Sequence, residues 1–265
     1  MSYGSMKSMS IDTHFHIFDK NAINPANSRY SVSNSALLED WFALSRAQGV
    51  TKGVIVQPSF LGTDNSFLIA AIKEHPELLK GVAVVGPSIA KHDLYALKKQ
   101  GISGVRLNLC ENPTPLEALA QHQALLHQLV ELGMHLELHH DDGLLNTLLL
   151  NIPSGLQIVI DHFGRPKSNI EFSIETKGID RHRDNLWVKL SAPYRTPLID
   201  HQAIYQYWLN TIGGSRLLWG SDWPHTQFES QQNYASQLQA LSMLCQPPTL
   251  REQILSRNPT SLYWS

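Results

Sequence analysis

The sequence predicts an α/β protein built as a single TIM-type (β/α)8 barrel. Short runs rich in Val and Ile recur eight times, amphipathic stretches separate them, and no change of composition marks a linker. Strands that alternate with helices favour one parallel sheet, and eight such units in 265 residues fit a closed barrel. An open doubly wound sheet is the alternative, but it usually has a glycine-rich turn after its first strand. Here the first run ends in His14-Phe15-His16.

The expected elements follow one another along the chain. Apolar runs bounded by glycine, proline or polar residues predict strands at 11–18, 53–59, 81–87, 104–109, 135–139, 157–163, 187–191 and 217–223. Apolar residues at helical spacing predict helices at 37–48, 65–75, 93–100, 116–132, 143–150, 200–211, 231–244 and 249–262. The stretch 167–185 is polar and irregular, so a helix is expected there without defined bounds. Residues 1–10 are small and polar, which predicts a disordered leader at 1–10 before one barrel domain at 11–265.

Composition narrows the class of protein. A hydrophobic fraction of 42% and a charged fraction of 17% allow a large core and exclude a disordered chain. A net charge of -2 offers no basic field, so no nucleic-acid partner is expected. No run reaches the roughly 20 apolar residues of a membrane span. Two distant cysteines, Cys110 and Cys245, indicate a reducing compartment, and the cytoplasm is the expected location. The oligomeric state stays open, with a homodimer among the alternatives.

Polar side chains share one face of several predicted strands, because side chains alternate along a strand. They are Asp12, His14 and His16 in the first, Gln57 and Ser59 in the second, Arg106 and Asn108 in the fourth, and His135, Glu137 and His139 in the fifth. The apolar faces must pack on helices, so the polar faces point into the barrel and meet near the carboxyl ends of the strands. Active sites of barrel enzymes lie there. Buried charges cost several kcal/mol unless they are paired, so this pattern favours a site, with a structural ion-pair network as the alternative.

The motif Asp12-Thr13-His14-Phe15-His16 places two imidazoles on one face at the end of the first strand. Such a pair can hold one metal ion or one polarised oxygen, although His-x-His alone is commonly a coincidence. A second motif, Ile160-Asp161-His162-Phe163-Gly164-Arg165-Pro166, ends the sixth strand at His162. Alternation places Asp161 on the side opposite His162, where we expect it to brace the loop.

The motif Leu218-Trp219-Gly220-Ser221-Asp222-Trp223-Pro224-His225 ends the last strand. Asp222 is either a catalytic carboxylate or the N-cap of a helix. Three histidines are expected on the same rim, which favours the catalytic reading.

Further candidates fall at or just beyond the ends of strands. They are Ser59, Arg106, His139, Tyr194, Arg195 and Gln227. With Arg165, this set holds three arginines near a histidine cluster, and the planar guanidinium suits carboxylate binding. Each arginine alone is equally well explained as a structural ion-pair partner.

In order and spacing, the three motifs resemble the amidohydrolase superfamily, in its amidohydrolase-2 branch, and the resemblance covers the chain from Asp12 to about Leu262. Gln57-Pro58-Ser59, Gly104-Val105-Arg106-Leu107-Asn108 and Lys189-Leu190-Ser191 with Tyr194-Arg195 are similar to the 2-pyrone-4,6-dicarboxylate lactonase subgroup. The resemblance implies a distorted β/α barrel that opens a lactone of a small carboxylate-bearing substrate.

The resemblance also implies roles for residues. It makes Asp222 the base and places His14, His16 and His162 around the attacked carbonyl. It assigns substrate carboxylates to a group of polar residues: Ser59, Arg106, Arg165, Arg195 and His225. His139 stands near where the lactonases have a tyrosine, and Tyr194 stays a candidate for substrate binding.

The resemblance leaves the metal open. Many superfamily members have a lysine or glutamate ligand after a middle strand, whereas this chain has His139 there and Glu137 deeper. That departure argues against two metals and leaves either no cofactor or one zinc ion on His14, His16, His162 and Asp222. A zinc-dependent decarboxylase on the same barrel is the alternative function, and a non-catalytic binding protein is a third.

Overall fold

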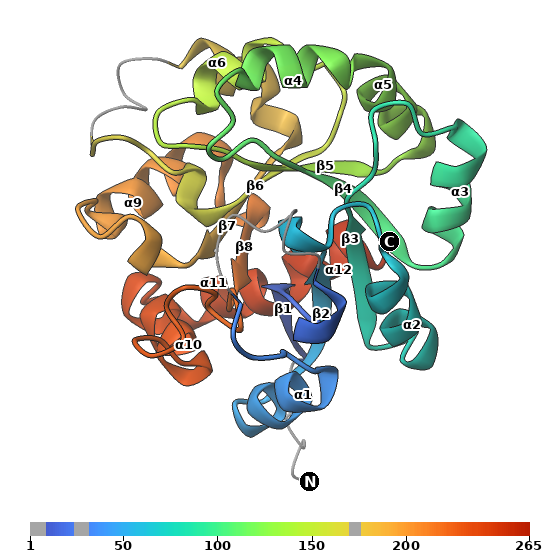
Figure 1. Ribbon diagram of the computed structural model, residues 1–265. Helices are drawn as coiled ribbons and strands as arrows, with labels where there is room; N and C mark the ends of the chain where they lie inside the picture. Colours follow the sequence, from blue (N-terminus) through green and yellow to red (C-terminus); the bar gives the residue numbers. More distant parts are fainter. Residues whose placement is uncertain (1–8, 24–31, 170–175) are drawn as a thin grey trace, which may run out of the picture.

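The computed structural model describes residues 9–23, 32–169 and 176–265. Its strands are β1 (Ser10–Phe15), β2 (Val50–Val56), β3 (Leu79–Ala83), β4 (Ile102–Asn108), β5 (His135–His139), β6 (Ile158–Ile160), β7 (Leu186–Ser191) and β8 (Leu217–Gly220). They pair in chain order, and every pair is parallel (Figure 1). Apart from residue 9 and Ser10, the predicted leader lies outside the described residues.

The barrel closes between β8 and β1. Phe15 and Trp223 form a parallel bridge, the His16 N–H donates to the Trp223 carbonyl, and the Asp222 N–H donates to the His14 carbonyl. The predicted eight-stranded parallel barrel is confirmed. Its first and last strands are shorter than predicted because the chain leaves the regular ladder just before His16 and Asp222.

Helices surround the barrel (Figure 1). They are α1 (Leu38–Ala47), α2 (Ser66–Glu74), α3 (Lys91–Lys99), α4 (Pro115–Gln121), α5 (Gln123–Leu132), α6 (Leu145–Leu150), α8 (Lys177–His182), α9 (His201–Ile212), α10 (Tyr234–Leu244), α11 (Pro248–Glu252) and α12 (Asn258–Tyr263). Short 3-10 turns are η1 (Lys20–Ala22), η3 (Ser59–Leu61), η4 (His162–Gly164), η5 (Arg183–Asn185), η6 (Pro193–Arg195) and η7 (Gly214–Arg216), and a π-helical turn, η8 (Gln253–Arg257), precedes α12. The helix predicted at 116–132 is two helices that meet at His122. Among the described residues, no helix combines the length and the apolar character needed to cross a membrane.

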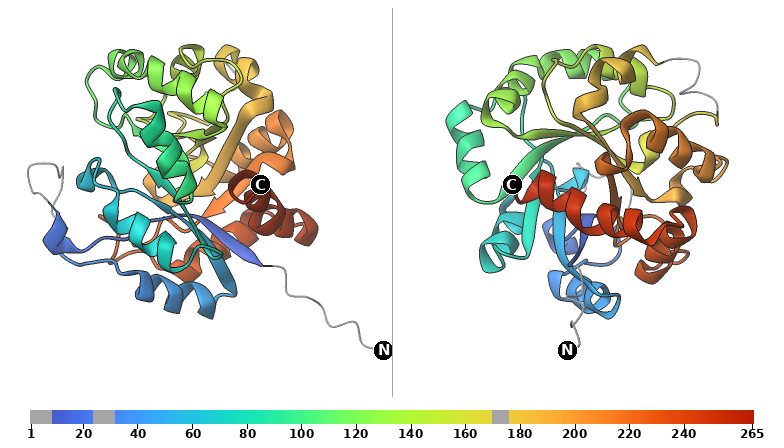
Figure 2. Two further views of the ribbon diagram at one scale, coloured as in Figure 1. Left: turned by 90° about the vertical axis from the view of Figure 1, so that its right-hand side faces the viewer. Right: turned by 180° about the vertical axis from the view of Figure 1, so that it is seen from behind.

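Two apolar layers hold the barrel. Outside it, the Phe15 ring stacks on Trp41 of α1 at a centroid distance of 3.9 Å. Inside it, valines of β2, β3 and β6 pack with Trp187 and Leu218, which lie near the amino ends of β7 and β8, and with Tyr263. The last helices cross this end of the barrel (Figure 2). Polar groups in the barrel are therefore reached from the carboxyl ends of the strands.

Asp12 departs from the predicted alternation. The register of β1 on β2 shifts between Asp12 and Phe15, so Asp12 does not share the inward face of His14. Its buried carboxylate accepts hydrogen bonds from the Ser221 N–H (2.9 Å) and hydroxyl (2.7 Å). It also accepts from Trp41 Nε1 (3.0 Å) and Tyr234 OH (3.1 Å). Asp12 thus joins β1 to the segment after β8 and to two outer helices.

His135 lies at the closed end of the barrel and predicts a pH effect on stability. Burial, followed by the nearby Lys189 ammonium, lowers the pKa of His135 to about 3. An unfolded histidine titrates near pH 6.5, so the unfolded chain gains a proton that the folded protein excludes as the pH falls from about 6.5 toward 3. When the pH is lowered from about 7 to 4.5, the free energy of unfolding of the His135→Phe variant should therefore fall by about 2–3 kcal/mol less than that of the parent protein. Urea denaturation at both pH values measures this, and equal losses in both proteins would contradict it.

Candidate active site

A cleft opens on the barrel axis at the carboxyl ends of the strands. It encloses about 690 Å³ of empty space, part of it open to solvent, and its wall is mostly polar. The predicted site residues that line it are His16, Ser59, Arg106, His139, His162, Arg165, Arg195, Asp222 and Gln227. His14, Tyr194 and His225 do not line the cleft, although His14 and Tyr194 contact Asp222, which does.

Asp222 faces three imidazoles across the barrel. Its Oδ1 lies 3.6 Å from Nε2 of His14, 3.6 Å from Nε2 of His16 and 4.0 Å from Nε2 of His162. Asp222 has a φ of 58°, in the left-handed region, which turns its side chain off the line of β8 and into the barrel. The structure therefore brings together the four residues for which a catalytic role is predicted.

The other oxygen of Asp222 is held in place by two donors. Oδ2 accepts hydrogen bonds from Tyr194 OH (2.5 Å) and Arg195 Nε (2.8 Å), both on η6. Burial raises the pKa of Asp222, but the Arg195 guanidinium, together with His162, His16 and His14 around the carboxylate, holds the pKa well below its usual value. Asp222 is therefore ionised at neutral pH. Its carboxylate caps no helix within the described ranges.

Each histidine is oriented by a bond at Nδ1, which leaves Nε2 directed toward Asp222. Nδ1 of His16 lies 2.7 Å from the Val56 carbonyl oxygen, which can only accept, so this Nδ1 carries the proton. Nδ1 of His162 lies 2.9 Å from the Ser191 hydroxyl. Burial lowers the pKa of His162 to about 3, so its ring is neutral at pH 7.

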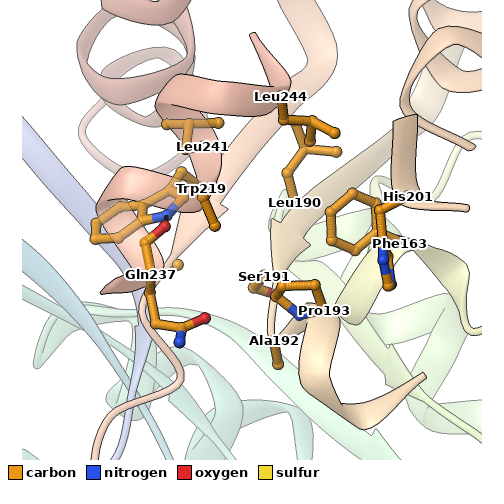
Figure 3. Close-up of a pocket in the computed structure, with 12 residues that line it drawn as sticks. Phe163, Leu190, Ser191, Ala192, Pro193, His201, Trp219, Gln237, Leu241 and Leu244 are labelled. Atoms are coloured by element: carbon orange, nitrogen blue, oxygen red, sulfur yellow. Dashed lines mark hydrogen bonds between the residues drawn. The ribbon is translucent and has the colours of Figure 1, made fainter. Parts of the chain in front are cut away.

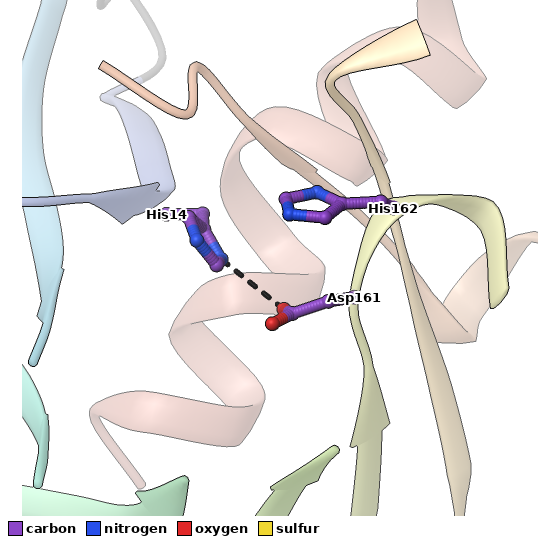
Figure 4. A group of neighbouring side chains, drawn as sticks. All are labelled: His14, Asp161 and His162. Carbon is purple, nitrogen blue, oxygen red and sulfur yellow. Dashed lines mark ion pairs between the residues drawn. The ribbon is translucent and has the colours of Figure 1, made fainter. Parts of the chain in front are cut away.

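His162 does not end a strand as predicted, because β6 stops at Ile160. The residues His162 and Phe163 have positive φ values of 50° and 60° and form η4. Strand alternation therefore ends at Asp161, which keeps the inward parity of Val159, while the turn brings His162 inward as well. Figure 4 shows His14, Asp161 and His162 directed toward one another. The expectation that Asp161 braces the loop is wrong.

Close to His14 lies a network of buried charges, and no sequence motif predicts that Asp161 and Lys189 belong to it. Asp161 Oδ2 accepts from Arg106 NH2 (3.0 Å), and Lys189 Nζ donates to Glu137 Oε2 (2.5 Å). Burial and the charge of Asp161 raise the pKa of Glu137 to about 7. One feature of the sequence indicated this network. Lys189 is a charged residue in the mostly apolar strand predicted at 187–191, on the same face as Ser191.

The three arginines differ in their partners. Arg106 and Arg195 are paired with the buried carboxylates of Asp161 and Asp222. Arg165 Nε lies 2.8 Å from Asp142 Oδ1, and the Asp142 side chain is 44% exposed. Arg165 is therefore the arginine that can exchange its partner for a ligand at the least cost.

Other wall residues surround Arg165. Its NH1 lies 3.1 Å from Cys110 Sγ and 3.4 Å from His139 Nε2. On the opposite side of the site, the buried His225 ring lies 6.0 Å from the Tyr194 ring. His225 packs behind Tyr194 and does not line the cleft.

A second cavity lies off the axis, between β7, β8 and the helices α9 and α10 (Figure 3). It encloses about 360 Å³, including space open to solvent, and its wall is largely apolar, with Phe163, Leu190, Trp219 and Leu241. None of the predicted site residues lines this cavity. The axial cleft is the candidate active site.

The donor set around Asp222 fits one divalent metal ion. The ligand atoms of His14, His16 and Asp222 lie within 4.8 Å of one another. Nε2 of His14 is buried and has no hydrogen-bond partner among the described residues. Imidazoles with one carboxylate suit zinc, and His162 Nε2 faces the same carboxylate oxygen. His14, His16, His162 and Asp222 would hold the ion.

Curated relatives cover nearly the whole chain. A 4-sulfomuconolactone hydrolase of Rhizobium radiobacter is 29% identical, over 95% of this chain and 89% of the relative. A 2-pyrone-4,6-dicarboxylate hydrolase of Comamonas testosteroni is 26% identical, over 96% of this chain and 90% of the relative. These relatives are hydrolases that act on lactones.

A solved structure agrees with them. A provisionally named 2-pyrone-4,6-dicarboxylic acid hydrolase from Pseudomonas putida superposes with a TM-score of 0.87 at 34% identity, covering 97% of each chain. More distant structures share the fold. One is an amidohydrolase from Burkholderia multivorans with bound zinc, at 16% identity, a TM-score of 0.78 and coverage of 97% of this chain and 99% of that one. Since the amidohydrolase family model, Amidohydro_2, matches residues 11–264, the protein belongs to the amidohydrolase family.

Proposed function

We propose that the protein hydrolyses a lactone of a small substrate that bears carboxylates, such as a pyrone dicarboxylate, with Asp222 as the base. The observation that carries the proposal is the ionised Asp222 Oδ1 facing three imidazole Nε2 atoms in a polar cleft. The lactone-hydrolysing relatives support the same reaction class.

The reaction begins with a water held between Asp222 and the lactone carbonyl. His16 carries a proton at Nδ1, and in the neutral form of this ring Nε2 accepts a hydrogen bond and orients the water. Asp222 removes a proton as the water oxygen bonds to the carbonyl carbon. A carboxylate of low pKa is a weak base, so we expect the proton to move late, when the new bond has made the water acidic.

The negative charge that develops on the carbonyl oxygen is stabilised by hydrogen bonds that His14 and His162 donate. His14 and His162 approach from β1 and η4, and a buried hydrogen-bond partner at Nδ1 holds each ring, so they are already in place when the charge develops. The tetrahedral centre then collapses, the bond to the ring oxygen breaks, and Asp222 returns its proton to that oxygen. A bound zinc ion would supply additional polarisation of the carbonyl or the water.

A panel of lactones tests the proposed function. Protein purified without added metal is analysed for metal content and assayed with pyrone dicarboxylate and sulfonated muconolactone substrates, before and after a chelator. We expect loss of lactone absorbance and release of the ring-opened acid. Release of CO₂ would instead support a decarboxylase, and binding without turnover would support a binding protein.

Arg165→Ala should raise KM for a dicarboxylate lactone by roughly 10- to 100-fold, with a smaller change in kcat. The basis is a lost charge-assisted hydrogen bond worth about 1.5–3 kcal/mol. Steady-state kinetics measure both constants. The matched control is Arg257→Ala, which removes a guanidinium whose side chain is 72% exposed. An unchanged KM in Arg165→Ala would reject the carboxylate-binding role.

A further inference from the structure

Lys189 is a fully buried lysine directly beneath His14. It projects from β7 into the barrel, and both its side chain and that of Glu137 are 0% exposed. Its Nζ donates to Glu137 Oε2 and lies 3.1 Å from Nδ1 of His14. The proposed reaction steps do not use the Lys189 ammonium.

The ammonium restricts where His14 carries its proton. A neutral imidazole has one N–H, and a lysine ammonium has donors but no acceptor. A hydrogen bond from Nζ to Nδ1 therefore needs a lone pair on Nδ1, which leaves the ring proton on Nε2.

Asp161 favours the opposite arrangement. Its Oδ1 also lies 3.1 Å from Nδ1 of His14, and a carboxylate oxygen would take the proton of an Nδ1–H. Glu137 Oε1 is the second carboxylate oxygen near Nδ1 of His14, at 3.5 Å. Neither carboxylate oxygen makes a hydrogen bond of acceptable geometry within the described residues, whereas the contact of Lys189 with Nδ1 does meet hydrogen-bond geometry. The arrangement of the side chains favours Lys189.

We propose that Lys189 is a positioning residue that fixes His14 in the tautomer with the proton on Nε2, so that His14 presents an N–H to the cleft. The use of that N–H as a donor to the carbonyl oxygen rests on the proposed function. The tautomer itself does not, and it is measured without a substrate.

The Nε2–H tautomer of His14 disfavours the binding of zinc. A protonated Nε2 cannot ligate a metal, so an ion at His14 requires the proton to move to Nδ1, where Asp161 accepts it. Lys189 and Asp161 therefore act in opposite directions. Lys189 favours hydrogen-bond donation by His14, and Asp161 favours ligation.

The direct test is nitrogen NMR of the full chain labelled with ¹⁵N-histidine, with the His14 resonances assigned by their loss in His14→Gln. We expect the His14 signals of the metal-free protein to show a protonated Nε2 and an unprotonated Nδ1. The reverse pattern would overturn the proposal, whether or not any lactone is hydrolysed.

Zinc affinity gives a second readout, measured by competition with a chromophoric chelator. Lys189→Met combined with Glu137→Gln should bind zinc at least about tenfold more tightly than Glu137→Gln alone, and its His14 signals should move to the Nδ1–H form. Asp161→Asn should bind zinc at least about tenfold more weakly than the parent protein. Near-ultraviolet circular dichroism confirms folding of each variant.

Arg106→Gln is the control for charge. It removes a cation that pairs with the same two carboxylates, Glu137 and Asp161. If Arg106→Gln tightens zinc as much as loss of Lys189 does, without a change in the His14 tautomer, the effect is one of net charge and the proposal fails.

Discussion

Replacement of Asp222 by Asn is expected to lower kcat for lactone hydrolysis by about 10²- to 10⁴-fold while the protein stays folded. The amide keeps the size of the carboxylate but cannot take a proton from water. Tyr194 OH and Arg195 Nε both donate to Oδ2 of Asp222, so an amide oxygen at that position can keep these contacts with its NH₂ toward the histidines. Steady-state kinetics with circular dichroism measure rate and fold together.

Asp93→Asn is the matched control for this substitution. Asp93 lies in α3, and its side chain is 58% exposed. We expect parent-like kcat and KM from this variant. An Asp222→Asn enzyme with the parent rate would remove Asp222 from the role of base.

Lys189→Met is expected to lower the free energy of unfolding by about 3–5 kcal/mol. The lost ammonium leaves the carboxylates of Glu137 and Asp161 with one cation, Arg106, at positions that water does not reach. Removing one partner of a buried ion pair costs more than removing both. Urea denaturation measures the loss, and adding Glu137→Gln should recover part of it.

An exposed ion pair offers the comparison. Lys91 and Glu131 pair across the surface with side chains 54% and 57% exposed. Lys91→Met should change the free energy of unfolding by less than about 1 kcal/mol, because solvent screens such pairs. Similar losses in Lys91→Met and Lys189→Met would show that the buried network contributes no more than a surface contact.

Much of the fold could be predicted from local pattern. Val- and Ile-rich runs identified all eight strands because a strand buried on both faces leaves a continuous apolar signal. The candidate site followed from the same pattern, since polar residues at strand ends such as His14 and Asp222 interrupt runs that packing alone would make apolar.

The remaining features depend on departures from regular geometry. The register shift in β1 moved Asp12 to the outer helices, and the left-handed turn after β6 made both Asp161 and His162 face inward. Strand alternation assumes extended backbone, so it fails at these positions. The partners of Arg106 and Lys189 come from other strands, and no local pattern in one strand specifies them.

The pairing of β1 with β8, which closes the barrel, determines when the candidate site can form during translation. The imidazoles at the start of the chain meet their carboxylate only when the last strand docks beside the first. Under the proposed mechanism, a nascent chain that still lacks β8 and Asp222 has no base, so it cannot turn over substrate while the rest is being translated. Under the proposed mechanism, turnover therefore requires closure of the barrel, and two fragments split at a loop between β1 and β8 should regain activity only by reassociating.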